Sequence, residues 1–101
     1  MFINVIWKYK LDQTKRVTVI DLPCGSKILT AQEQRGEFVV WVLHGDDVTL
    51  KVPVDFVVAI TGSSSICLLS NYKYLSTIQG KVSEDVFHIF YKKSHNVKEI
   101  E

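Results

Sequence analysis

Apolar and polar residues alternate with a period of two along most of the chain. In residues 3–11, Trp7 and Tyr9 fall on one side while Lys8 and Lys10 fall on the other. This spacing is typical of a half-buried β-strand, because successive side chains of a strand point to opposite faces of the sheet. Alternating or short apolar runs predict strands at residues 3–11, 16–20, 27–34, 37–44, 48–52, 56–60, 72–79 and 86–93, with a short ambiguous run at 66–69.

Turn-forming residues separate these runs and set the expected connections. The polar break at residues 12–15 predicts a hairpin between the first two strands. Arg35 and Gly36 predict a second hairpin, because glycine permits the positive φ that tight turns need. Pro53 has no N–H to donate to a sheet, so we expect an edge or a bend there rather than one continuous strand.

Two runs, residues 38–43 and 56–60, are apolar on both faces. Such strands are typically central and covered on both sides, or covered on one side and engaged in an interface on the other. Because a domain of 101 residues has little stability to spare, an interface of this kind also favours a homo-oligomer.

Composition supports a β fold. Val, Ile and Thr together make up 29 of the 101 residues, whereas Ala occurs only 2 times. β-Branched side chains suit a pleated surface, and Ala is the best helix former. We therefore predict an all-β protein, a compact antiparallel β-sandwich or small barrel of about eight short strands. One domain covers residues 1–93, and the charged tail at 94–101 is expected to fray.

Charge and hydropathy exclude several classes of function. The formal net charge is only +1, so the chain lacks the excess of Lys and Arg that a nucleic-acid binder needs. No apolar run approaches the ~20 residues needed to span a bilayer, and the first residues do not form a signal peptide. These features predict a soluble, cytoplasmic protein without a membrane association.

The sequence contains none of the common catalytic or cofactor-binding motifs. Phosphate loops, dinucleotide-binding glycine patterns, zinc-protease motifs and nucleophile elbows are all missing. His44 and His88 with Cys67 could form a nucleophile and base, but three such residues are expected by chance in a chain of this length. Two cysteines without Cys-x-x-Cys spacing favour ordinary thiols over a metal site. We therefore expect no enzyme, no cofactor and no metal.

Three groups of residues are candidates for ligand binding. The loop at 61–65 combines glycine with hydroxyl groups that can hold phosphate or ribose oxygens, although a plain solvated loop has the same composition. Aromatic residues beside lysines, at 7–10 and 72–74, could stack on a base, although core packing is the other use of these rings. On the last strand, the outward row of His88, Phe90 and Lys92 suits a binding surface. The candidate residues are Trp7, Lys8, Thr61, Gly62, Ser63, Ser64, Ser65, Tyr74, His88 and Lys92.

Several short segments resemble a family of small uncharacterised phage and prophage proteins that carry a domain of unknown function. The more specific are Ile-Trp-Lys-Tyr-Lys-Leu at residues 6–11 and Val-Phe-His-Ile-Phe at 86–90. The resemblance covers nearly the whole chain. It implies a phage origin and supplies no activity.

We therefore expect a non-enzymatic phage protein that blocks or sequesters a host or defence component in the host cytoplasm. In its sharper form the ligand is a nucleotide second messenger, bound between subunits, with Trp7 or Tyr74 stacking on the base. Two alternatives stay open: a structural or assembly accessory protein of the virion, and a direct protein inhibitor of a host enzyme.

Overall fold

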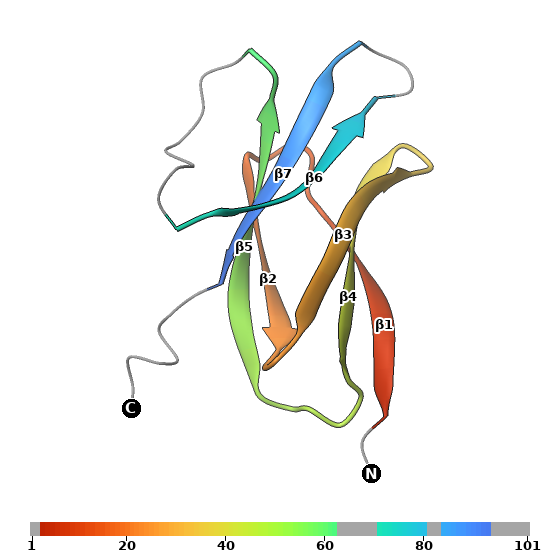
Figure 1. Cartoon of the computed structure of the whole chain (residues 1–101), viewed down its shortest axis with the longest axis vertical. Helices are drawn as coiled ribbons and strands as arrows, with labels where there is room; N and C mark the ends of the chain where they lie inside the picture. Colours follow the sequence, from red (N-terminus) through yellow and green to blue (C-terminus); the bar gives the residue numbers. More distant parts are fainter. Residues whose placement is uncertain (1–2, 63–70, 81–83, 94–101) are drawn as a thin grey trace.

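The computed structural model describes residues 3–62, 71–80 and 84–93, and in these ranges it has seven strands and no helix (Figure 1). Accordingly, no helix in this part of the chain could cross a membrane. The strands are β1 (Asn4–Lys10), β2 (Val17–Pro23), β3 (Lys27–Gln34), β4 (Glu37–Gly45), β5 (Lys51–Ile60), β6 (Lys73–Gln79) and β7 (Val86–Lys93). The ambiguous run at 66–69 and the tail at 94–101 lie outside the described residues.

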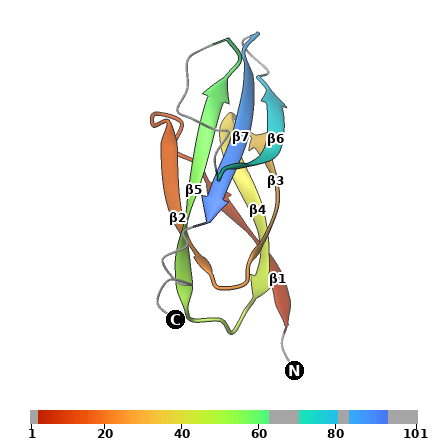
Figure 2. The same cartoon turned by 60° about the vertical axis from the view of Figure 1, so that its left-hand side comes forward.

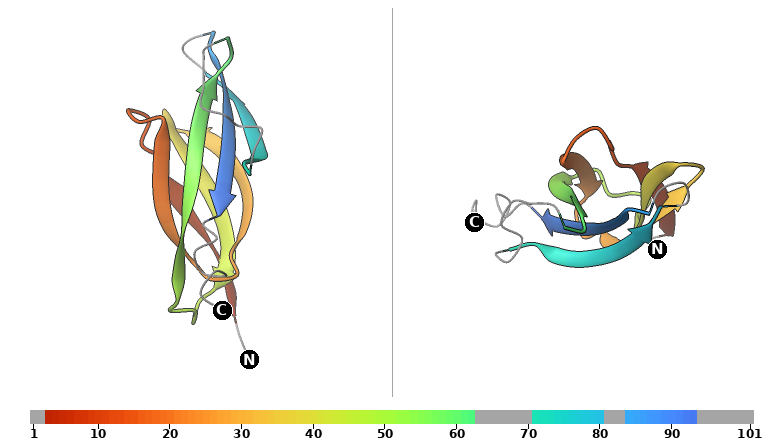
Figure 3. Two further views of the ribbon diagram at one scale, coloured as in Figure 1. Left: turned by 90° about the vertical axis from the view of Figure 1, so that its left-hand side faces the viewer. Right: turned by 90° about the horizontal axis from the view of Figure 1, so that it is seen from above.

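The strands form two antiparallel sheets. A three-stranded sheet has the order β1-β4-β3, and a four-stranded sheet has the order β2-β5-β7-β6. The two sheets pack face to face, as Figures 2 and 3 show, and do not close into a barrel. The all-β prediction is confirmed, and of its two architectures the sandwich is the one found.

The core lies between the inner faces of the two sheets. Its largest fully buried side chains include Phe56 and Ile89 from the four-stranded sheet, which face Val40 and Val42 of β4. β4 and β5 are the two runs that are apolar on both faces, and each is an interior strand of its sheet, as predicted. Burial of such apolar surface, at about 25 cal/mol per Å², is the main stabilising contribution to a fold of this kind.

The predicted hairpin at Arg35 and Gly36 is present, but the predicted hairpin of the first two strands is wrong. Both Arg35 (φ 54°) and Gly36 (φ 81°) have positive φ, as a two-residue turn between twisted strands requires. β1 instead pairs with β4, and β2 pairs with β5 in the other sheet. Leu11 directly follows β1 and is 5% exposed. Its N–H donates a hydrogen bond to the Phe38 carbonyl, and the chain then crosses to the second sheet. Placed in opposite sheets, the inward faces of β1 and β2 cover the same core from both sides.

The predicted break at Pro53 is also wrong, because β5 runs continuously through it. Pro53 lies opposite Asp21 of β2. Even-numbered residues of β5 bond to β2, as the Val58 N–H to Arg16 carbonyl bond shows, so the nitrogen of Pro53 faces the β7 side. On that side the described pairing of β5 with β7 extends only as far as Val54, which lies opposite Lys93. The missing N–H therefore removes no hydrogen bond from the described ladders.

The two sheets meet at one pair of edges, where β3 lies beside β6 (Figure 1). Both strands have a register shift there, β3 between Ile28 and Thr30 and β6 just before Ser76. The buried Ser76 hydroxyl accepts a hydrogen bond of 2.8 Å from the Ala31 N–H and lies 3.0 Å from the Thr30 hydroxyl. A side chain of β6 thus satisfies the main-chain edge of β3, and the two edges are tied together.

Candidate functional site

The candidate site lies on the outer face of the four-stranded sheet, over β6 and β7. Alternation along β7 turns Phe87, Ile89 and Tyr91 toward the core and leaves the even-numbered row facing outward. That outward row is His88, Phe90 and Lys92, as the sequence predicted. The adjacent outward positions belong to β5 and β6.

Two threonine hydroxyl groups hold the imidazole of His88, and a tyrosine hydroxyl contacts one of them. The Thr61 Oγ1 lies 2.7 Å from Nε2, and the Thr77 Oγ1 lies 3.1 Å from Nδ1. The Tyr74 hydroxyl lies 2.7 Å from the Thr77 Oγ1, and Thr61 also donates to the Val86 carbonyl at 3.2 Å. We call Thr61, Tyr74, Thr77 and His88 the histidine network. Both ring nitrogens are hydrogen-bonded, and these contacts fix the orientation of the imidazole between Thr61 and Thr77.

Tyr74 carries the exposed aromatic surface of this face. Its side chain is 58% exposed, and its ring meets the Phe90 ring edge-on, with centroids 5.8 Å apart. Tyr74, Phe90, Val57 and Val17 are successive cross-strand partners, so they form an aromatic and apolar row across all four strands. A ring fixed at its edge and by its hydroxyl presents a flat face to solvent, which suits stacking.

A hollow of about 250 Å³ lies where β6 begins and β7 ends. Its described lining residues are Asn71, Lys73, Tyr91, Lys92 and Lys93, and we call it the lysine pocket. Three lysine residues therefore border one small volume in a chain whose formal net charge is only +1. Such a local excess of positive charge favours an anion.

The three lysines differ in what holds them. The Lys92 ammonium lies 5.0 Å from the centroid of the Tyr72 ring, a cation–π contact, and the Lys93 ammonium donates to the Ser26 carbonyl at 2.9 Å. Asp55 is the cross-strand partner of Lys92, but these two side chains form no ion pair within the described part of the chain. Within the described residues, none of the three ammonium groups is therefore held by this carboxylate.

The structure brings some of the predicted site residues together and separates others. Thr61, Tyr74, His88 and Lys92 share the outer face over β6 and β7, and Gly62 (φ 88°) follows Thr61 in an exposed turn. Trp7 and Lys8 lie on β1 in the other sheet, away from this face. Ser63, Ser64 and Ser65 lie outside the described residues.

Four pocket residues were missed by sequence reasoning. Lys73 was visible between two tyrosines and Lys93 beside Lys92, but nothing in the sequence showed that their strands are paired. Tyr91 and Asn71, which has a positive φ of 75°, become pocket residues only because β6 begins beside the end of β7.

The histidine pair considered as a catalytic base does not assemble. His44, at 8% exposure, faces the core from β4, with Nε2 3.3 Å from the Tyr9 hydroxyl and Nδ1 3.0 Å from the Gly45 carbonyl. Burial raises the pKa of that tyrosine. His88 faces outward from the other sheet, and Cys67 lies outside the described residues. Among the residues that the structure describes, no three His, Cys, Asp or Glu side chains gather to hold a metal ion.

Comparison with known proteins places the chain in a family. No curated protein sequence and no solved structure matches it. Residues 3–99 match the family model described as Domain of unknown function (DUF7352). Because the match covers nearly the whole chain, this protein belongs to the DUF7352 family.

Proposed function

We propose that this protein is a non-enzymatic binding protein for a small phosphate-bearing ligand, with a nucleotide as the ligand class. The observation that carries the proposal is the lysine pocket, where Lys73, Lys92 and Lys93 border one hollow. Lysine ammonium groups are compact cations that bind phosphate oxygens through charge-assisted hydrogen bonds. A volume of about 250 Å³ lies below the usual range for drug-sized ligands and suits the phosphate end of a larger molecule.

The outer face beside the pocket supports a nucleotide over a bare anion. Lys92 and Phe90 lie two residues apart on the same face of β7, roughly 7 Å from each other along the strand. Tyr74 is the cross-strand partner of Phe90, so its exposed ring lies one residue pair away from the ammonium of Lys92. A phosphate held by the lysines would leave an attached base within reach of the tyrosine face, where stacking contributes about 1–3 kcal/mol.

The biological role follows from the family resemblance rather than from the site. A small phage protein that binds a nucleotide without converting it would sequester a host or defence signal in the host cytoplasm. The virion-assembly and enzyme-inhibitor alternatives predict no affinity for such a ligand.

Isothermal titration with ADP and with inorganic pyrophosphate, at low ionic strength, tests the proposal. Both should bind, and the double variant Lys73→Gln/Lys92→Gln should weaken both at least tenfold, since each charge-assisted bond is worth about 1.5–3 kcal/mol. The matched control Lys10→Gln/Lys15→Gln removes the same charge from exposed ion pairs remote from the pocket and should change neither affinity.

A third variant separates the two parts of the site. Tyr74→Ala should weaken ADP while leaving pyrophosphate unchanged, because only the nucleotide has a base to stack. If Tyr74→Ala weakened the binding of ADP and of pyrophosphate equally, Tyr74 would contribute to folding and not to stacking on a base. If neither ligand produces heat with the wild-type protein, the proposal fails.

A further inference from the structure

β1 is an edge strand whose outer main-chain groups are free to pair. It bonds to β4 on one side, and no described segment pairs with its other side. Two hydrogen bonds fix the direction of its groups: the Leu11 N–H donates to the Phe38 carbonyl, and the Asp46 N–H donates to the Ile3 carbonyl, each at 2.9 Å. Odd-numbered residues of this segment therefore bond to β4. The outward N–H and C=O groups belong to Asn4, Ile6, Lys8 and Lys10.

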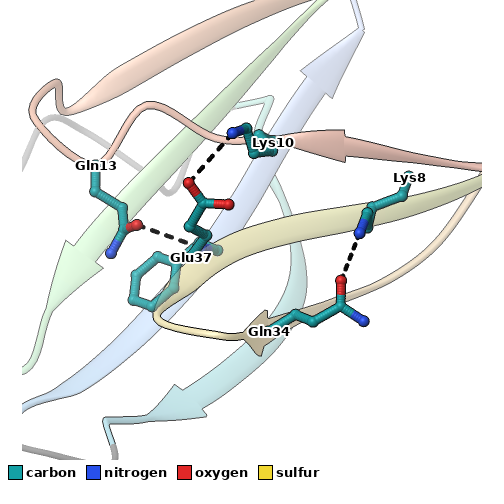
Figure 4. Close-up of polar contacts among 6 residues, drawn as sticks. Lys8, Lys10, Gln13, Gln34 and Glu37 are labelled. Carbon is teal, nitrogen blue, oxygen red and sulfur yellow. Dashed lines mark hydrogen bonds and ion pairs between the residues drawn. The ribbon is translucent and has the colours of Figure 1, made fainter.

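The lysines that would ordinarily protect such an edge are turned away from it. Lysine on an edge strand discourages pairing with another chain, because a charge would have to be buried or crowded. Here the Lys8 ammonium reaches across the outer face of its own sheet to the Gln34 Oε1, at 2.6 Å, and lies 5.9 Å from the Trp41 ring centroid. The Lys10 ammonium pairs with Glu37 at 3.2 Å (Figure 4). Neither ammonium group therefore lies at the open edge of β1.

The same strand also exposes large apolar side chains. Ile6 and Trp7 of β1 are 59% and 57% exposed, and Ile3, which directly precedes the strand, is 60% exposed. Trp7 faces the side of the other sheet, but its position on the edge strand leaves it largely uncovered. An edge with free main-chain groups and apolar side chains is a template for strand addition.

We propose that β1 pairs antiparallel with β1 of a second copy of this chain, about a two-fold axis that passes through Ile6. The pairing would join the two three-stranded sheets into one continuous six-stranded sheet. It does not depend on the proposed ligand, because the lysine pocket lies on the other sheet.

The direction of the main-chain groups limits the possible registers. Residues whose N–H and C=O groups point outward must lie opposite one another, so even-numbered residues pair with even-numbered residues. The two-fold axis therefore passes through a residue and not between two neighbouring residues. An axis at Ile6 places Ile6 against its own copy, Trp7 against Val5 and Ile3 against Tyr9, so that every apolar residue meets an apolar one. An axis at Trp7 would instead place Ile6 against Lys8. Chemical complementarity therefore selects the register centred on Ile6.

Charge does not oppose the antiparallel arrangement. In this register Lys8 of one copy lies opposite the uncharged Asn4 of the other. Like charges are not placed opposite one another.

Sedimentation velocity over a range of loading concentrations tests the pairing. The wild-type chain should form a dimer, and Ile6→Lys, which places two ammonium groups on the axis, should raise the dissociation constant of the dimer by more than about tenfold. Ile6→Pro should do the same, because it removes an outward N–H that β4 does not use. Val19→Lys is the matched control: Val19 is also 59% exposed and lies on β2, an edge strand of the other sheet, so dimerisation should be unchanged.

A cysteine pair tests the register in a Cys24→Ser/Cys67→Ser background. Ile6→Cys should form an intermolecular disulfide on mild oxidation, because directly paired residues have Cα atoms about 5.5 Å apart, within disulfide range. Lys8→Cys should not, since its copy lies roughly 14 Å further along the strands. A wild-type monomer, dissociation by Val19→Lys, or equal cross-linking at both positions would each overturn the proposal.

Discussion

Replacing Ser76 by alanine tests how the two sheets are joined. The Ser76 hydroxyl on β6 accepts the Ala31 N–H of β3 at 2.8 Å, and Ala31 is only 3% exposed. The variant would leave that N–H buried with no acceptor. An unsatisfied buried donor costs about 1–3 kcal/mol, so we expect the free energy of unfolding to fall by ~2 kcal/mol.

Urea denaturation followed by far-ultraviolet circular dichroism measures this change, and thermal unfolding provides a second readout. For a domain of this size, 2 kcal/mol corresponds to a fall in Tm of roughly 8–16 °C. Thr30→Val is the matched control: it removes only the hydroxyl that lies 3.0 Å from Ser76, and the Ala31 N–H keeps its acceptor. This control should cost less than about 1 kcal/mol.

Equal destabilisation by Ser76→Ala and Thr30→Val would refute the reasoning. It would mean that the hydroxyl pair, and not the satisfied main-chain donor, stabilises the contact between β3 and β6. A loss below about 0.5 kcal/mol for Ser76→Ala, within the range of ordinary surface substitutions, would mean that water or a main-chain shift replaces the lost acceptor.

Three further outcomes are expected. Arg35→Asn should raise the free energy of unfolding, measured by urea denaturation, by up to about 1 kcal/mol, because asparagine tolerates the positive φ of this turn. Gly36→Ala should lower the free energy of unfolding by at least as much, and the reverse order would contradict the turn assignment. Hydrogen bonds from the Thr14 hydroxyl and N–H lower the pKa of Asp12, so this carboxylate favours folding above its unfolded pKa near 4, and the contribution is lost as pH falls. NMR titration should show that Thr14→Val raises the pKa of Asp12, and an unchanged pKa would exclude the hydroxyl as its cause. Phe56→Ala, at a fully buried position, should cost about 3–5 kcal/mol by chemical denaturation, and a loss below 1 kcal/mol would exclude Phe56 from the core.

The sequence predicted most strand positions because their signals are local. Alternation marked β1, and the positive-φ pair Arg35 and Gly36 marked the one hairpin turn that was identified correctly. The pairing of β1 with β4 was not predictable in this way, since it depends on which inward faces share a core. Pro53 misled for a similar reason: its missing N–H matters only on the side where a partner strand lies, and that side is fixed by the register.

The candidate site was predicted in part for the same physical reason. The outward row containing His88 and Lys92 follows from alternation within one strand. The lysine pocket needs Lys73 of β6 beside Lys93 of β7, and that neighbourhood depends on a register with an irregularity between Tyr74 and Ser76. No spacing along the chain encodes such an irregularity.

The pairing of β1 with β4 also bears on how the chain folds. β1 is synthesised before its partner β4, which follows only after β2 and β3. At about 5–20 residues per second, β1 waits on the order of seconds with both of its edges open. The β3–β4 hairpin can close locally during that time, whereas the pairings of β1 and β2 carry the larger loop-closure cost and should limit the folding rate. Solubility during synthesis therefore depends on how quickly β1, with its exposed apolar side chains, pairs with β4.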